Sequence, residues 1–237
     1  MLMTPERRTG PELLDLPPTH YSLEELKGCF YDLTLVNQYL GDNRAILKHL
    51  GRMTAGNTRE GSTILDIGTG SADIPIAIAK WARENGIHFE ITAIDNNPMA
   101  LDIARSRARG YPGVNIFKED ALEMPFPDKS FDFVLCSKTL HHLNSEEAVR
   151  LIKEAARVSR RGYMIMDLRR GWIPYILICL LTRLFTANRL TRNDGPLSVL
   201  RSFTPQELAL LATSAGEKRF QVCREPFWLM LLMGEAG

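Results

Sequence analysis

The sequence predicts an α/β fold in which a doubly wound, mostly parallel sheet of seven strands carries helices on both faces. From Thr63 onward, short apolar runs typical of strands alternate with stretches whose apolar residues recur at helical spacing. The first apolar run leads directly into a glycine turn at Gly68. The 237 residues are 45% hydrophobic and 24% charged, an ordinary globular composition. Because strands separated by helical crossovers pair in parallel, this alternation indicates the fold class.

Two segments precede the sheet. Residues 1–19 are rich in proline and polar residues, which predicts a flexible arm. Residues 20–60 are expected to form an N-terminal helical lid, since apolar residues recur at helical spacing between Tyr21 and Leu50. A polar linker from Gly51 to Ser62 ends this lid. Residues 61–237 then form the ligand-binding domain.

The domain begins with alternating strands and helices. Asn97 is placed to cap the helix after the second strand, and Pro98 suits its first position, where no N–H is needed. Glu146 and Glu147 favour the start of the helix after the fourth strand, because they face the positive end of its dipole. The strands are expected at residues 63–67, 89–94, 114–117, 131–136, 163–166, 220–223 and 227–232.

Residues 171–203 interrupt the alternation and are expected to form an apolar helical insertion after the fifth strand, on the substrate side. The insertion combines a helix from Trp172 to about Ala187 with a polar loop from Asn188 to Ser202. Its apolar run, Trp172–Leu181, has ten residues and includes a proline, whereas a bilayer span needs about twenty. The run therefore covers a core, a pocket or a membrane surface. Thr204 and Glu207 form a capping box that starts the next helix.

Charge and cysteine content exclude several classes of protein. The 29 Lys+Arg against 28 Asp+Glu leave a net charge of +1, too small to draw the chain to nucleic acid. No spacing among the four cysteines suggests a zinc site or a local disulfide framework. Prolines, rather than an apolar segment, follow Arg7 and Arg8, which argues against a secretory signal. We expect a cytoplasmic protein without a transmembrane span, a metal or a nucleic-acid partner.

Acidic residues around the glycine turn indicate the charge of its ligand. Asp66 precedes Gly68, and Asp73 stands where a dinucleotide fingerprint has its third glycine. Two carboxylates would repel a pyrophosphate, but they suit S-adenosylmethionine, which carries an ammonium and a sulfonium. An NAD-dependent oxidoreductase is the alternative that these acids oppose.

The segment Leu65–Gly70 resembles the first motif of the class I S-adenosylmethionine-dependent methyltransferases, although Ala72 replaces their usual third glycine. Three further positions match in order. Asp95 corresponds to the acid that binds both ribose hydroxyls, and Asp120, followed by Ala121, to the acid at the adenine amino group. Phe131–Val134 with Ser137 correspond to the fourth strand, whose end approaches the methionine part. Each acid alone also fits a cap or a surface position, but four in register favour the cofactor.

The resemblance covers roughly Tyr31 to Met166 and implies a Rossmann-like fold, S-adenosylmethionine as cofactor, S-adenosylhomocysteine as product, and no metal. It implies cofactor contacts at Asp66, Gly68, Thr69, Gly70, Asp95, Asn96, Asp120, Ala121 and Ser137. Arg44 and Arg192 add charges suited to the cofactor's carboxylate or to an acidic group of the substrate.

Within this class, Leu140–Leu143 and Tyr31–Leu33 with Asn37 are similar to the ubiquinone/menaquinone-type group of small-molecule methyltransferases. Ser137–Leu140 stands where enzymes acting on amide or nucleobase nitrogens carry an Asn-Pro-Pro-Tyr type motif, so an oxygen or carbon acceptor is expected. His141 and His142 are the candidates for the base that removes the acceptor's proton, with His141 favoured. In the alternative, one of the pair packs or caps the next helix.

The apolar lid and insertion predict an aromatic or lipid-tailed acceptor, such as a quinone precursor, a phenolic lipid or a polyketide. The substrate contacts are expected at Tyr31, Asp167, Arg169, Trp172 and Arg192. An ordinary packed helix or a dimer surface at Trp172–Leu181, and a solvated Arg169, are the alternatives, which leave a monomer or a homodimer open. A methyltransferase-like subunit that stabilises a partner without catalysis is the remaining hypothesis.

Overall fold

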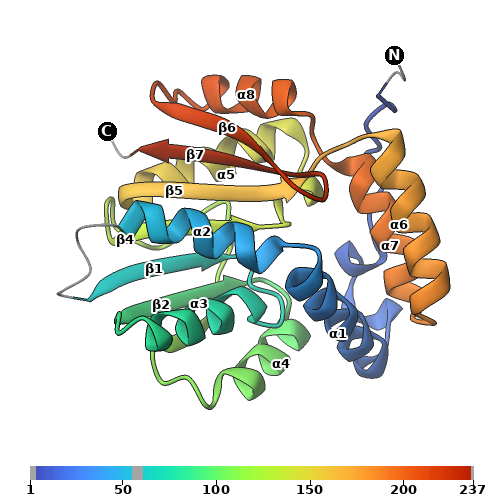
Figure 1. Ribbon diagram of the computed structural model, residues 1–237, viewed down its shortest axis with the longest axis horizontal. Helices are drawn as coiled ribbons and strands as arrows, with labels where there is room; N and C mark the ends of the chain where they lie inside the picture. Colours follow the sequence, from blue (N-terminus) through green and yellow to red (C-terminus); the bar gives the residue numbers. More distant parts are fainter. Residues whose placement is uncertain (1–3, 55–60, 236–237) are drawn as a thin grey trace.

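The computed structural model describes residues 4–54 and 61–235, and it contains the expected sheet of seven strands (Figure 1). The strand order is β3-β2-β1-β4-β5-β7-β6, with β7 antiparallel to both neighbours and all other pairs parallel. The strands are β1 (Ser62–Ile67), β2 (Phe89–Asp95), β3 (Val114–Lys118), β4 (Phe131–Ser137), β5 (Ser159–Leu168), β6 (Phe220–Glu225) and β7 (Leu229–Glu235). The predicted fold class is confirmed.

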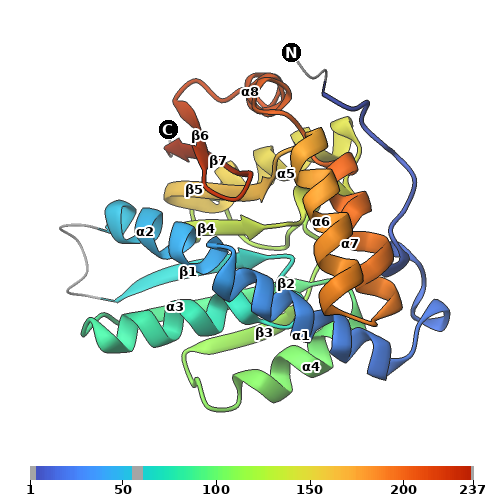
Figure 2. The ribbon, with the colours of Figure 1, turned by 45° about the vertical axis from the view of Figure 1, so that its right-hand side comes forward.

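Helices cover both faces of the sheet (Figures 1 and 2). One core lies under α2 (Asp42–Thr54) and α3 (Asp73–Glu84), where Leu50 and Ile78 pack toward Phe133 of β4. Next to α3, α4 (Pro98–Ala108) packs on β2 and β3. The other core lies under α5 (Ser145–Val158) and α8 (Pro205–Ser214), which bury Leu151 and Leu208. The apolar periodicities of the sequence therefore mark the buried faces.

The N-terminal lid consists of two helices rather than one. The first, α1 (Leu23–Tyr39), ends before Gly41, and α2 then runs on through Thr54 into the segment predicted as a linker. Gly41 has a φ of +90°, a conformation that residues with a side chain rarely adopt. The chain turns at this glycine, which directs α1 toward the carboxyl ends of the strands while α2 covers the sheet (Figure 1). The rest of the predicted linker, residues 55–60, lies outside the described residues.

We expect Gly41→Ala to lower the free energy of unfolding by about 1–2 kcal/mol, because alanine is strained at this φ. Gly51→Ala is the matched control. Gly51 is helical, and a Cβ there would meet Trp81 at 3.4 Å, an ordinary contact. Alanine at position 51 should therefore raise stability by about 0.5–1 kcal/mol. Urea denaturation of both variants measures the two values, and changes of the same sign would contradict the assigned helix break.

Residues 4–20, here called the N-terminal strap, follow the surface instead of forming a free arm (Figure 2). The strap contains the short helices η1 (Leu13–Asp15) and η2 (Pro18–His20). The N–H groups of Leu13 and Leu14 donate to the carboxylate of Asp194 at 2.8 and 3.1 Å. Arg7 donates to the carbonyl oxygens of Leu143 and Arg201. These contacts explain why a segment without periodicity is nevertheless packed.

The insertion after β5 contains two helices, α6 (Trp172–Phe185) and α7 (Arg189–Arg201), so the prediction of a polar loop at 188–202 is wrong. The side chain of Asn188 caps α7 by accepting from the N–H of Thr191. Burial of Leu190 and Val199 then outweighs the unfavourable Pro196 inside the helix. No helix in the described part of the chain is both long and apolar enough to cross a membrane.

Candidate active site

A cavity of about 980 Å³ lies at the carboxyl ends of β1, β2 and β4. This is the switch point of the sheet, where β1 pairs with β2 on one side and with β4 on the other. Open α/β sheets bind their ligands at this position. The remaining walls come from α1, α6, α7 and the N-terminal strap. Segments from both ends of the chain thus enclose one site.

Backbone geometry makes the turn after β1 tight. The N–H groups of Gly68 and Thr69 both donate to the carbonyl of Ile94, at 2.9 Å each. Gly68 has a φ of +69°, and a Cβ there would lie 2.2 Å from Oγ1 of Thr139, so no larger residue fits. Ala72 also adopts a left-handed conformation, with a φ of 61°. Glycine adopts this conformation without strain, whereas alanine is strained in it, yet the turn still forms.

Asp66 is a buried carboxylate with an unused oxygen. Its side chain lines the cavity and is only 2% exposed. Its Oδ2 accepts no hydrogen bond from any residue that the structure describes. Burial, with a smaller contribution from the charge of Asp95, raises the pKa of Asp66 to about 7. A carboxylate in this state is suited to meet a cationic group.

Asp95 joins two loops through one carboxylate. Its Oδ2 accepts from the N–H of Gly70 at 2.8 Å, and its Oδ1 accepts from the N–H of Asn97 at 2.9 Å. Burial raises the pKa of Asp95, although these backbone donors oppose the shift. Each carboxylate oxygen can accept a second hydrogen bond, so the group has capacity left for the hydroxyls of a ligand.

Two histidines face the cavity from η3 (Leu140–His142), directly after β4. The Nδ1 of His141 lies 2.7 Å from Oδ1 of Asp167, whose Oδ2 accepts from the N–H of His141 at 2.8 Å. Although burial opposes it, the contact with His141 holds the pKa of Asp167 below its usual range. The Nδ1 of His142 contacts Asp15 of the N-terminal strap. In each imidazole, Nδ1 thus forms a hydrogen bond with a carboxylate.

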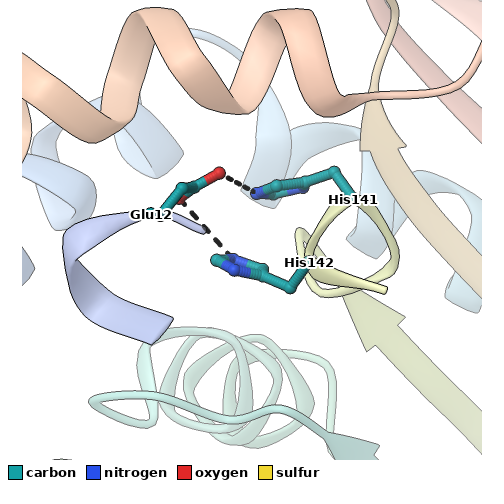
Figure 3. Close-up of side chains that lie close together, drawn as sticks. All are labelled: Glu12, His141 and His142. Carbon is teal, nitrogen blue, oxygen red and sulfur yellow. Dashed lines mark ion pairs between the residues drawn. The ribbon is translucent and has the colours of Figure 1, made fainter. Parts of the chain in front are cut away.

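The other nitrogen of each imidazole is directed toward Glu12 (Figure 3). The Nε2 of His141 lies 3.6 Å from Oε1 of Glu12, and the Nε2 of His142 lies 3.9 Å from Oε2. Burial raises the pKa of Glu12 to about 7. The Nε of Arg201, 3.7 Å from Oε1, donates at 3.1 Å to the carbonyl of His141. Because Glu12 and both histidines line the cavity, this group forms part of its wall.

The cavity brings together nearly all of the residues predicted to contact the cofactor. They are Asp66, Gly68, Thr69, Gly70, Asp95, Asn96, Asp120, Ala121 and Ser137. The loop after β3 is shaped by Asp120, whose Oδ1 accepts from the N–H of Leu122 at 2.8 Å. Arg44 instead lies exposed on α2, because that helix turns Ala45 and Ile46 toward the core.

The five predicted substrate contacts lie outside the lining of this cavity. On α1, Phe30 and Leu33 face inward, so the intervening Tyr31 is 65% exposed. On α6, Ile178 and Thr182 face the cavity, whereas Trp172 is exposed at the start of the helix. The remaining three have other contacts: Asp167 supports His141, the N–H of Arg169 donates to Trp228, and Arg192 donates to the carbonyl of Thr186.

Sequence patterns missed several charged residues of the site. Glu12 and Asp15 lie in the proline-rich strap, and Asp194 and Arg201 lie in the segment predicted as a loop. A weak signal was present, since Glu12 and Asp15 flank Leu13-Leu14, an apolar pair within a polar segment. In the structure Leu13 and Leu14 are partly buried, and Glu12 beside them is buried with them.

Comparison with known proteins connects this geometry to one family. Residues 64–162 match the family model described as "Methyltransferase domain". A demethylmenaquinone methyltransferase from Bacillus licheniformis is 34% identical over 112 residues, which are 47% of this chain and 46% of that protein. One from Lysinibacillus sphaericus is 29% identical over 130 residues, 55% of this chain and 51% of that protein. The chain thus spans about half the length of the curated relatives it matches.

Solved structures share the whole fold. A SAM-dependent methyltransferase from Aquifex aeolicus has a TM-score of 0.65 at 19% identity and covers 92% of this chain and 100% of its own. Magnesium protoporphyrin IX methyltransferase from Synechocystis, solved with bound SAH, has a TM-score of 0.57 at 14% identity and covers 83% of this chain and 84% of its own. At such identities the similarity shows the fold alone.

Proposed function

We propose that this chain is an S-adenosylmethionine-dependent methyltransferase that methylates an oxygen or a carbon of a small, apolar acceptor. Its residues 64–162 match the methyltransferase domain, and it is distantly related to the demethylmenaquinone methyltransferases. The observation that carries the proposal is a pair of carboxylates beside a glycine turn, the buried Asp66 and the half-buried Asp95. They repel a pyrophosphate and attract a cation.

The residues of the cavity fit S-adenosylmethionine. The unpartnered Oδ2 of Asp66 is an acceptor for an ammonium group, and Asp95 retains capacity for two ribose hydroxyls. Asp120 and Ala121, after β3, also line the cavity, where they would hold the adenine. When bound, the cofactor supplies a methyl group on a sulfonium, which is an excellent leaving group.

The chain's own contribution is alignment and exclusion of water. Aligned reactants account for roughly 7–11 kcal/mol of barrier lowering, so a strong acid or base is not required for the transfer itself. An acceptor hydroxyl must still lose its proton, and His141 and His142, which line the cavity, are the groups proposed to assist its release. Asp167 and Asp15 fix the orientation of the two imidazoles.

The acceptor side of the cavity favours an apolar molecule. Its lining includes apolar side chains from α1, α6 and α7: Cys29, Phe30, Leu33, Val36, Ile178 and Val199. A volume of about 980 Å³ lies at the upper end of the range for ligand pockets and leaves room for two molecules. The relatives named for demethylmenaquinone support a quinol, or a related phenol, as the acceptor.

Calorimetric titration of the purified protein with S-adenosylmethionine, S-adenosylhomocysteine and NAD tests the proposal. We expect micromolar binding of the two adenosyl-sulfur ligands and none of NAD, because pyrophosphate meets Asp66. A screen with a labelled methyl group over phenols and quinols then identifies the acceptor. Binding of NAD alone would contradict the cofactor assignment. Cofactor binding without transfer to any small acceptor would instead favour a non-catalytic subunit.

A further inference from the structure

We propose that Glu12, His141 and His142 bind one divalent transition-metal ion in the wall of the cavity. The ion would hold an oxygen of the acceptor. This role rests on the proposed function, whereas the binding of the ion does not. The three residues are the only group of this kind found among the described residues: each offers one ligand atom, and these three atoms lie within 4.8 Å of one another.

The carboxylate of Glu12 faces both imidazole rings (Figure 3). The two imidazole rings lie side by side, with centroids 4.2 Å apart and planes tilted by 34°. Their Nε2 atoms face separate oxygens of Glu12, at 3.6 and 3.9 Å. Nitrogen and oxygen bind zinc-like ions at about 2.0–2.2 Å, so two ligands of one ion stand about 3–3.5 Å apart. Small side-chain rotations therefore bring the three into a coordination sphere.

A carboxylate at Nδ1 of each histidine favours the tautomer whose Nε2 lone pair can bind a metal ion. Asp167 contacts Nδ1 of His141, and Asp15 contacts Nδ1 of His142. A carboxylate in this position accepts the Nδ1 proton and leaves the Nε2 lone pair directed outward. Metal-binding histidines have this arrangement of outer partners, which fixes the tautomer and raises the basicity of the ligand nitrogen. The same pattern on two adjacent histidines points to one shared ion.

Charge supports the same conclusion. Glu12 is 2% exposed, and its Oε1 accepts no hydrogen bond from the described residues. The carboxylates of Glu12, Asp15 and Asp167 surround the two imidazoles. Arg201 pairs with Glu12 and Asp15, and Arg7 donates to the carbonyl of His141. Arg201 directs its N–H groups to Asp15 and to the carbonyls of Gly10, His141 and His142. Because the three carboxylates outnumber the two guanidinium groups, a cation bound between Glu12 and the imidazoles would be favoured.

The ligand types indicate which ion binds and what it does. Two imidazoles and one carboxylate suit zinc, cobalt or ferrous iron better than magnesium or calcium, which prefer oxygen ligands. Three protein ligands leave positions open, and here they open to the cavity. An acceptor hydroxyl that binds there loses its proton to solvent, because the ion stabilises the oxyanion. The acceptor class is therefore a phenol or quinol that binds as its anion.

Cobalt(II) titration of the metal-stripped full-length protein tests the site. We expect one equivalent to bind, with the visible absorption of a four- or five-coordinate ion and a matching calorimetric signal. Glu12→Gln keeps the shape of the side chain and should weaken binding at least about tenfold, as should His142→Gln. His88→Gln is the matched control, because His88 is exposed and lies outside the group. It should leave the affinity unchanged.

Absence of saturable cobalt binding in the wild type would overturn the inference. Equal affinity in Glu12→Gln and the wild type, or an equal loss in His88→Gln, would also overturn it. Titration of the same samples with S-adenosylmethionine separates the two proposals and reports whether each variant is folded. Cofactor binding without cobalt binding would contradict the metal site alone. Cobalt binding without cofactor binding would contradict the proposed function alone.

Discussion

Asp95→Ala weakens the binding of S-adenosylmethionine by about 2–4 kcal/mol, which is roughly 30- to 900-fold in the dissociation constant. The side chain has two functions that alanine removes. It offers acceptor oxygens to the ribose hydroxyls, and it holds the N–H groups of Gly70 and Asn97 that shape both loops. Because those N–H groups lose their partner, the turn after β1 also loses its fixed position.

Calorimetry with S-adenosylmethionine measures this effect. Asp102→Ala is the matched control, because Asp102 lies exposed on α4 and contacts only Arg105 among the described side chains. Its affinity should equal that of the wild type. Asp95→Asn, which keeps one acceptor oxygen, should fall between the two. An unchanged dissociation constant in Asp95→Ala would mean that the ribose does not bind at the end of β2.

Asp66→Asn stabilises the ligand-free protein more at pH 8 than at pH 5. The pKa of Asp66 in the folded chain is about 7, above its ordinary value of 3.8, so the folded chain binds this proton more tightly than the unfolded chain. The resulting stabilisation is full below about pH 4 and is lost as the pH rises through 7. Asparagine carries no charge at pH 8. The gain in the free energy of unfolding should be about 2–3 kcal/mol larger at pH 8 than at pH 5.

Urea denaturation at both pH values tests this expectation. The effect of burying a neutral amide is the same at pH 5 and pH 8, so it cancels in the difference. Asp102→Asn, the same substitution at an exposed position, should show no such difference. A pH-independent effect of Asp66→Asn would contradict the raised pKa. The same variant should bind S-adenosylmethionine more weakly, since an amide attracts an ammonium less than a carboxylate does. If Asp66→Asn is more stable than the wild type but binds the cofactor more weakly, the role of Asp66 is binding and not stability.

Local sequence signals predicted the half of the site that the sheet builds. Asp66, Gly68, Asp95 and Asp120 each lie at or just beyond the end of a strand with a clear apolar pattern, so their place at the carboxyl edge follows from the topology. The turn geometry, which depends on positive φ values, was likewise visible as glycines. In this part of the chain each functional residue lies close in sequence to the element that positions it.

The other half depends on contacts that no local pattern reveals. Glu12 contacts His141, more than a hundred residues away in sequence. Its position depends on two further contacts: the N–H groups of η1 donate to Asp194, and Arg201 lies beside the carboxylate of Glu12. The helix that supplies Asp194 contains Gly195 and Pro196, which disfavour helix in isolation. Tertiary burial decided its conformation. Side-chain direction was equally hidden, since one residue along α1 separates the inward Phe30 from the outward Tyr31.

The N-terminal strap has a consequence for the order of assembly. It is attached to the rest of the chain by a backbone hydrogen bond, from the N–H of Arg8 to the carbonyl of Leu200, and by side-chain contacts with partners such as Leu143, Asp194 and Arg201, all distant in sequence. No β-ladder among the described residues holds it. A piece of chain synthesised first can therefore dock only after α7 has formed. Detaching it breaks fewer cooperative contacts than opening the sheet does, so its local unfolding has the lower free energy. Release of this one segment therefore allows ligands to enter and leave the cavity while the carboxyl ends of the strands stay in place.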